Sequence, residues 1–130
     1  MKNKHYLLFI PLFTLLLFGN AFAQSKKEMV AHKWTYAGIE EFGVVKKPDS
    51  TMQGDWLQLN DDGSFSGVNK GKKWSGTWTI NEAGAILTFT DASSKKKLTY
   101  NLKKVDDQEL VIEYQTPDLV RTRYHYTIAK

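Results

Sequence analysis

The chain has 130 residues, a formal net charge of +4 and no cysteine. This length suits one small domain and is too short for two, and the lack of cysteine excludes stabilisation by disulfides. Residues 24–130 hold 16 of the 18 Lys and Arg and all 14 Asp and Glu, so their net charge is only +2. A charge this small argues against binding of nucleic acid through a strongly basic surface.

The first 23 residues have the three parts of a secretory signal peptide. Two lysines give a positive start, residues 7–18 are almost entirely apolar, and Ala21-Phe22-Ala23 has small residues at both ends of the expected cleavage site. The apolar run is well short of the roughly 20 residues of a membrane-spanning helix. We therefore expect cleavage after Ala23 and a mature domain at residues 24–130 without a transmembrane segment. Since Gln24 stands where a bacterial lipid anchor requires cysteine, we expect a protein that is free in the periplasm or secreted.

From Lys33 onward, apolar and polar residues alternate with period two, and turn residues recur at short intervals. This pattern is typical of short strands joined by hairpins. No stretch of ten or more residues in this part has helical spacing. The eight predicted strands lie near residues 33–36, 55–60, 64–68, 73–80, 85–90, 98–103, 110–115 and 120–128.

The alternation also predicts how these strands are arranged. One buried and one solvated face is the pattern of antiparallel sheet, and short connections favour a meander in which neighbours in sequence pair. A meander of about eight strands closes into an up-and-down barrel or folds into a β-sandwich, and closure removes the exposed edges. We expect the all-β barrel, with the sandwich as the alternative.

Four features of this strand pattern also occur in a known group of proteins. They are Trp34 early on the first strand, Leu57-x-Leu59-x₃-Gly63-x-Phe65, Gly76-x-Trp78 followed by Leu87-x-Phe89, and Tyr100-x-Leu102. In these features residues 33–128 resemble the small secreted bacterial lipocalin-like (calycin-type) proteins. His32 departs from the pattern, since lipocalins usually carry glycine two residues before the tryptophan. The resemblance implies a calyx-shaped barrel that binds a small apolar ligand, without implying which one.

Whether this barrel has a cavity depends on about twenty mostly large side chains on its expected inner face. They fill the barrel and leave at most a shallow cup, or they line an aromatic pocket in which tyrosine hydroxyls orient a ligand. Four expected inner tyrosines favour a pocket, because a buried hydroxyl needs a partner. The predicted ligand contacts are Trp34, Tyr36, Phe42, Trp78, Tyr100, Tyr114 and Tyr126.

The one long connection, residues 38–54, separates the first two predicted strands. A loop of this length in a compact domain is often functional. Either it covers the barrel mouth as a lid that carries Phe42, or residues 42–46 form an extra hairpin that plugs the end.

No motif for hydrolysis, phosphate binding, dinucleotide binding or metal ligation occurs in the chain. We therefore expect a non-enzymatic, exported protein that binds a small hydrophobic or amphipathic molecule, with no cofactor and no metal. It is expected to be a monomer without a nucleic-acid partner, since its lysine clusters suit solvated turns. The alternative is a solid barrel that docks another envelope or secreted protein through the 38–54 loop.

Overall fold

The computed structural model describes residues 25–130, and the expected signal peptide at residues 1–23 lies outside these residues. A short helix at residues 25–30 precedes nine strands in the described part. The strands are β1 (Lys33–Glu41), β2 (Val44–Lys46), β3 (Trp56–Leu59), β4 (Ser64–Asn69), β5 (Lys72–Ile80), β6 (Ile86–Asp91), β7 (Lys97–Val105), β8 (Glu109–Gln115) and β9 (Arg121–Ile128).

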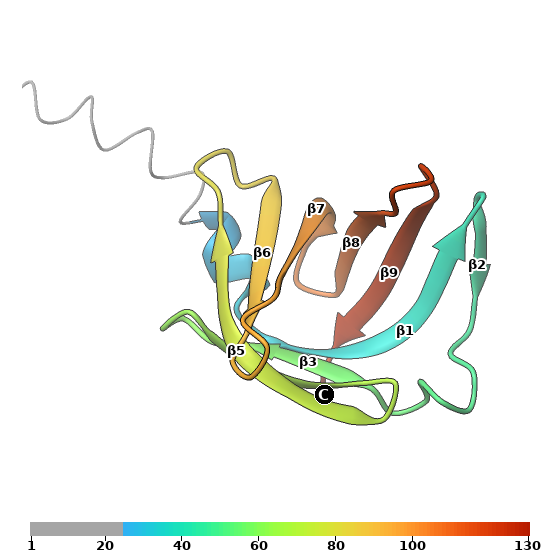
Figure 1. Ribbon diagram of the computed structural model, residues 1–130, viewed down its shortest axis with the longest axis horizontal. Coiled ribbons are helices and arrows are strands. Elements are labelled where there is room, and N and C mark those ends of the chain that lie inside the picture. Colours follow the sequence, from blue (N-terminus) through green and yellow to red (C-terminus); the bar gives the residue numbers. More distant parts are fainter. Residues whose placement is uncertain (1–24) are drawn as a thin grey trace, which may run out of the picture.

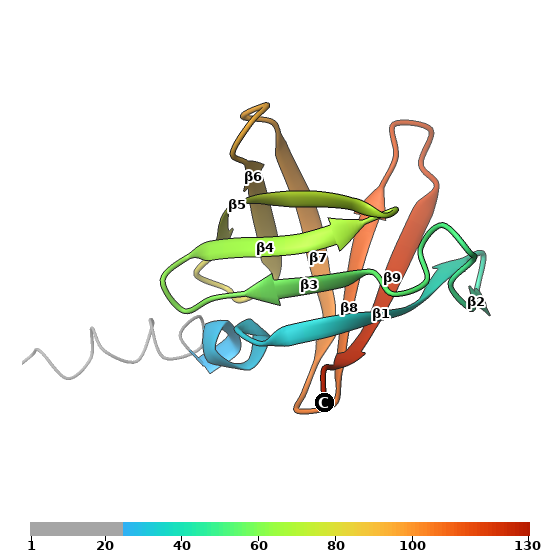
Figure 2. The ribbon, with the colours of Figure 1, turned by 90° about the horizontal axis from the view of Figure 1, so that it is seen from below.

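Eight of these strands form a closed antiparallel barrel. Neighbours pair in the order β1-β3-β4-β5-β6-β7-β8-β9, and the β1–β9 pair closes the ring. Figures 1 and 2 show the strands curving around a common interior. The predicted closed meander is confirmed, and the sandwich alternative is wrong because the first and last barrel strands pair through seven residue pairs, from Trp34↔Ile128 to Glu41↔Thr122.

The long connection contains more strand than the sequence pattern suggests. β1 does not end near Tyr36 but continues to Glu41, because a bulge between Tyr36 and Gly38 keeps it paired with β9 after β3 has ended. β2 then pairs back onto the end of β1 and adds a ninth strand outside the ring. This hairpin does not plug the barrel, since Val44 and Val45 are both exposed.

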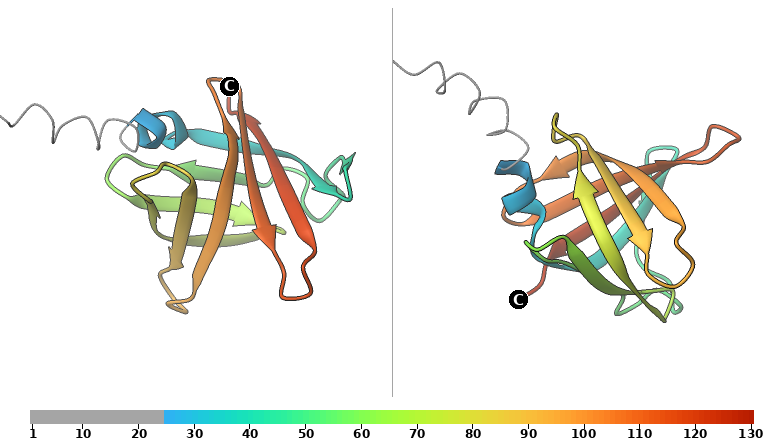
Figure 3. Two further views of the ribbon diagram at one scale, coloured as in Figure 1. Left: turned by 90° about the horizontal axis from the view of Figure 1, so that it is seen from above. Right: turned by 60° about the vertical axis from the view of Figure 1, so that its left-hand side comes forward.

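The core fills one end of the barrel. Trp34, Leu59, Trp78 and Leu87 are almost fully buried there, and the helix lies across this end with Val30 in the same cluster. The Trp34 indole Nε1–H donates to the Val30 carbonyl oxygen at 2.9 Å. The helix therefore closes one end of the barrel, and in Figure 3 it lies away from the β1–β2 hairpin at the other end.

Candidate functional site

A cavity of about 100 Å³ lies inside the barrel at the end opposite the helix. β1, β3 to β9 and the segment before β3 all contribute to its walls. The β4–β5 turn stands at its rim, since Asn69 and Lys70 belong to the lining. The lining residues are Tyr36, Met52, Asp55, Leu57, Val68, Asn69, Lys70, Trp74, Phe89, Tyr100, Ile112, Tyr124 and Tyr126.

Aromatic rings make up much of this wall, and they hold one another in place. Ring centroids are 5.8 Å apart for Trp74 and Phe89, 5.6 Å for Phe89 and Tyr100, and 6.2 Å for Tyr100 and Tyr124. Tyr36 packs against Tyr126 at 5.7 Å. Most of these pairs are edge-to-face, an arrangement that the ring quadrupole favours. The wall is therefore a fixed aromatic surface rather than a set of free side chains.

The polar groups on this wall are mainly tyrosine hydroxyls. Burial raises the pKa of Tyr36 to about 12, with smaller contributions from Tyr124, Asp49 and Asp55. Burial also raises the pKa of Tyr100, Tyr124 and Tyr126. The phenols therefore stay protonated near neutral pH, and each offers one donor and two acceptor sites.

The Tyr36 hydroxyl is the exception to the rule that buried polar groups are paired. The residue is 5% exposed, and its hydroxyl has no hydrogen-bond partner among the described residues. An unpaired buried hydroxyl costs about 1–3 kcal/mol. A ligand in the cavity that forms a hydrogen bond with this hydroxyl would offset this cost.

Replacing Tyr36 with phenylalanine tests this point. We expect the free energy of unfolding to stay unchanged or to rise by about 1 kcal/mol, because the change removes an unsatisfied group without leaving a cavity. Urea unfolding of the ligand-free protein measures it. A loss of about 1 kcal/mol or more would show that the hydroxyl already has a stabilising partner.

Among residues 25–130, the segment between β2 and β3 supplies the only carboxylate on the cavity wall. Asp55 is 4% exposed and accepts the backbone N–H of Lys70 at 2.6 Å and of Gly71 at 3.2 Å. Its own backbone carbonyl accepts the Tyr36 N–H at 3.0 Å. Met52, from the same segment, is also buried against the cavity. Asp55 stands at the first position of the predicted strand 55–60, and no motif in the sequence marks it as a cavity residue.

The seven predicted contact residues are not all in one place. Tyr36, Tyr100 and Tyr126 line the cavity, and Tyr114 does not line it, although its ring lies 5.8 Å from that of Tyr100. The other three residues lie elsewhere. Trp34 and Trp78 belong to the core at the helix end, and Phe42 points into solvent from the β1–β2 turn. Trp74, Phe89 and Tyr124 line the cavity but were not in the predicted contact set.

Comparison with known proteins supports the fold but not a family. No protein-family model matches the chain, and no curated protein matches it. Among solved structures, it is similar to a lipocalin-like protein from Bacteroides uniformis, with a TM-score of 0.58 and 18% sequence identity. The match covers 77% of this chain and 98% of that one. This chain has a lipocalin-like fold.

An open groove of about 460 Å³ adjoins the cavity of the lipocalin-like barrel. Asn69, Lys70, Trp74 and Phe89 line both, so the cavity and the groove lie side by side. The groove runs between the β4–β5 turn and the β6–β7 loop. Its remaining lining residues are Lys72, Lys73, Asp91, Ser93, Ser94, Lys96 and Leu98.

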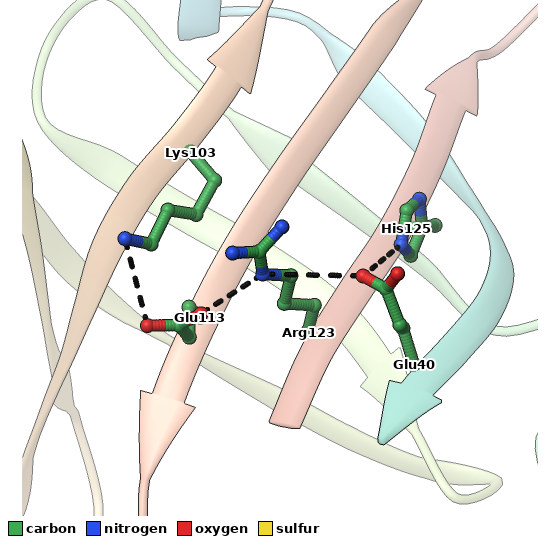
Figure 4. A network of polar contacts seen from close by, with 5 residues as sticks. All are labelled: Glu40, Lys103, Glu113, Arg123 and His125. Carbon is green, nitrogen blue, oxygen red and sulfur yellow. Dashed lines mark hydrogen bonds and ion pairs between the residues drawn. The ribbon is translucent and has the colours of Figure 1, made fainter. Parts of the chain in front are cut away.

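The largest polar network lies on the outside of the lipocalin-like barrel, across β7, β8, β9 and β1 (Figure 4). Arg123 Nε donates to Glu113 Oε2 at 2.9 Å, and Lys103 Nζ lies 3.6 Å from Glu113 Oε1. Glu40 Oε2 lies 3.9 Å from Arg123 Nε and 3.3 Å from His125 Nε2. Glu113 is buried beneath these partners. The network joins the strands that close the barrel, which is a structural role.

We expect this network to make stability depend on pH. Burial would raise the pKa of Glu113, but the Arg123 hydrogen bond and the charges of Lys103 and Arg121 outweigh it and hold the pKa below its usual range. A lowered carboxyl pKa stabilises the fold above the unfolded-state pKa, and this stabilisation is lost as pH falls through the folded-state value. Glu113→Gln should therefore cost about 1 kcal/mol at pH 7, since its partners are partly exposed.

Urea unfolding of the wild type and of Glu113→Gln at pH 7 and pH 3 measures this dependence. The difference between them should shrink at the lower pH. An equal difference at both values would contradict the assignment, and Glu82→Gln, in an exposed turn, is the control.

In residues 25–130 no three His, Asp or Glu lie close enough together to hold a metal ion. His32 packs edge-on against Trp34 at a centroid distance of 6.1 Å, and His125 faces Glu40. No helix in the described part of the chain is long and apolar enough to cross a bilayer.

Proposed function

We propose that this protein is an exported, non-enzymatic lipocalin-like barrel that binds a small amphipathic molecule at its open end. The observation that carries the proposal is the cavity, which combines a fixed aromatic wall with a few inward polar groups. That combination is typical of small-molecule sites. The leader-like residues 1–23 support export to the periplasm or the outside of the cell.

The size of the cavity limits what it can enclose. A cavity of 150 Å³ in another protein holds one benzene molecule, so about 100 Å³ suits a group of a few heavy atoms. The rest of a larger ligand would lie in the adjoining groove, over Trp74 and Leu98. The site therefore suits a molecule with a compact end and a longer body.

The ionisable groups of the cavity favour binding over catalysis. A general acid or base works best when its pKa lies near the working pH. The tyrosines have pKa values raised away from neutrality, and both oxygens of Asp55 are already engaged by backbone N–H groups. The tyrosine hydroxyls are therefore poorly suited to exchange a proton at pH 7.

Tryptophan fluorescence tests the proposal, because Trp74 is the tryptophan on the cavity wall. Fatty acids, quinones and alkylamines are titrated into the wild type, Trp74→Phe and Trp56→Phe. Trp56 is a matched control, since its ring lies on the outside under Lys33 Nζ at 4.6 Å. A saturable change that Trp74→Phe loses and Trp56→Phe keeps supports the proposal. No saturable change with any compound counts against it.

A second candidate function is docking of another protein through residues 38–54. Phe42 is 87% exposed and Leu119 is 74% exposed, and both line an open groove of about 550 Å³ between the β1–β2 and β8–β9 turns. Large exposed apolar side chains that lie together often mark an interaction surface.

Pull-down from the native envelope tests this candidate with three baits. A specific protein that the wild type and Tyr100→Phe capture, and that Phe42→Ala with Leu119→Ala loses, would support docking at this surface. Equal capture by all three baits would refute it.

A further inference from the structure

The cavity wall holds one buried carboxyl group, that of Asp55. Each of its two carboxylate oxygens accepts a backbone N–H. The two amides that bind it come from Lys70 and Gly71 in the β4–β5 turn. A buried carboxylate beside an open cavity favours a positive group in that cavity.

The charges that act on the tyrosine hydroxyls have the same sign. Asp49 and Asp55 raise the pKa of Tyr36, and Glu41 raises that of Tyr124, in each case after burial. Asp55 also acts on Tyr126. The nearest lysine at the rim, Lys70, is exposed, and its charge acts on Asp49. The inner end of the cavity therefore lies in the field of carboxylates.

The other groups on the wall also suit a cation. Six aromatic residues line the cavity, and the faces of such rings attract ammonium groups most strongly when water is excluded. The Tyr36 hydroxyl lacks a partner and can accept a hydrogen bond. A primary ammonium has three N–H donors. It can therefore donate a hydrogen bond to the Tyr36 hydroxyl oxygen and lie against the aromatic rings at the same time. The aromatic lining residues are Tyr36, Trp74, Phe89, Tyr100, Tyr124 and Tyr126.

We propose that the cavity binds the primary ammonium end of a small organic amine, between the Tyr36 hydroxyl, the aromatic wall and the Asp55 carboxylate. This inference rests on the proposed function, because it names the chemical class of ligand for the same cavity. A carboxylate or phosphate in this position would lie close to the buried Asp55 carboxylate, which repels it.

The charge of the outer groove indicates which group the far end of the ligand carries. Lys70, Lys72, Lys73 and Lys96 line the groove, so it disfavours a second positive group and favours a neutral or anionic one. An amine whose far end carries a carboxylate matches the charge of both parts.

Four five-carbon compounds of matched length separate the effect of the ammonium group from that of the apolar chain and from that of a carboxylate. They are pentylamine, 1-pentanol, pentanoate and 5-aminopentanoate, each titrated into the purified protein at pH 7 by calorimetry. We expect pentylamine to bind at least tenfold more tightly than 1-pentanol or pentanoate. We expect 5-aminopentanoate to bind at least as tightly as pentylamine, because its carboxylate reaches the lysines.

Two variants with matched controls test the residues. Tyr36→Phe should weaken the binding of pentylamine at least threefold. The control Tyr114→Phe should leave this binding unchanged, since Tyr114 does not line the cavity. Asp55→Asn should remove the preference for pentylamine over 1-pentanol. Its control is Asp106→Asn, since Asp106 also accepts two backbone N–H groups, from Gln108 and Glu109, at a distant turn. If Asp55→Asn does not fold, the comparison of Tyr36→Phe with Tyr114→Phe tests the inference on its own.

The results distinguish the inference from the proposed function. If 1-pentanol or pentanoate binds as tightly as pentylamine, the inference is overturned, while binding of a small molecule in the cavity stands. If none of the four compounds binds at millimolar concentration, the inference is also overturned, and the wider fluorescence panel decides on the proposed function. If Tyr36→Phe binds pentylamine as the wild type does, the amine does not lie where the inference places it.

Discussion

Replacing Gly76 with alanine is expected to destabilise the barrel by about 3 kcal/mol or more, at the upper end of the usual cost of overpacking. A Cβ at this position would lie 1.9 Å from the Thr90 carbonyl oxygen and 3.0 Å from the Ala92 nitrogen. Both are backbone atoms of the next strand and its turn, so no flexible side chain can move aside. β5 and β6 would have to separate where Gly76 faces Asp91.

Urea unfolding followed by circular dichroism measures this loss. Thr77→Ala is the matched control, because the neighbouring Thr77 is exposed on the same strand and should change stability by about 0.5 kcal/mol or less. A Gly76→Ala protein as stable as the control would show that the two strands are not this close. Gly76 also belongs to the Gly-x-Trp pattern of the sequence, and its physical reason is this close approach of backbone.

Replacing Trp34 with alanine is expected to cost about 3–5 kcal/mol, the usual range for a large aromatic in a core. Trp34 is 0% exposed and lies between the helix and the barrel. The change also removes the hydrogen bond from its indole to Val30. The helix at residues 25–30 should therefore separate from the end of the barrel, and its residues lose their protection.

Hydrogen exchange and urea unfolding together test this second expectation. Amides of residues 29–31, which donate within the helix, should exchange much faster in Trp34→Ala, and the whole domain should unfold at lower urea. Trp56→Ala, which removes a tryptophan from the outer face, should leave the exchange of this helix unchanged. Fast exchange in the wild type itself would contradict the role of Trp34 as its anchor.

The fold was largely predictable because alternation with period two reports which face of a strand is buried. Trp78, Leu87 and Phe89 were predicted to face inward, and they do. The hairpin spacing indicated the neighbour pairing, and the need to cover edges indicated closure. β2 was harder to predict, because three exposed residues carry no alternation that distinguishes a strand from a loop.

The candidate site was only partly predictable. Period two assigns a face but not a depth along the barrel axis, so Trp34 and Tyr36, two residues apart, were expected in one site. The structure places Trp34 in the core at the helix end and Tyr36 at the cavity. Asp55 reaches the cavity through the path of residues 47–55, which depends on tertiary contacts with the β4–β5 turn. No local pattern in the sequence indicates that path.

The proposed function requires that a ligand enters the barrel at the end opposite the helix. An NMR titration that follows the backbone amides, with each of the four five-carbon compounds in turn, tests it most directly. The account predicts saturable shifts, for at least one compound, that are largest at Tyr36, Asp55, Gly71 and Tyr100. Shifts confined to the surface around Phe42 and Leu119, or no saturable shift with any compound, would contradict it.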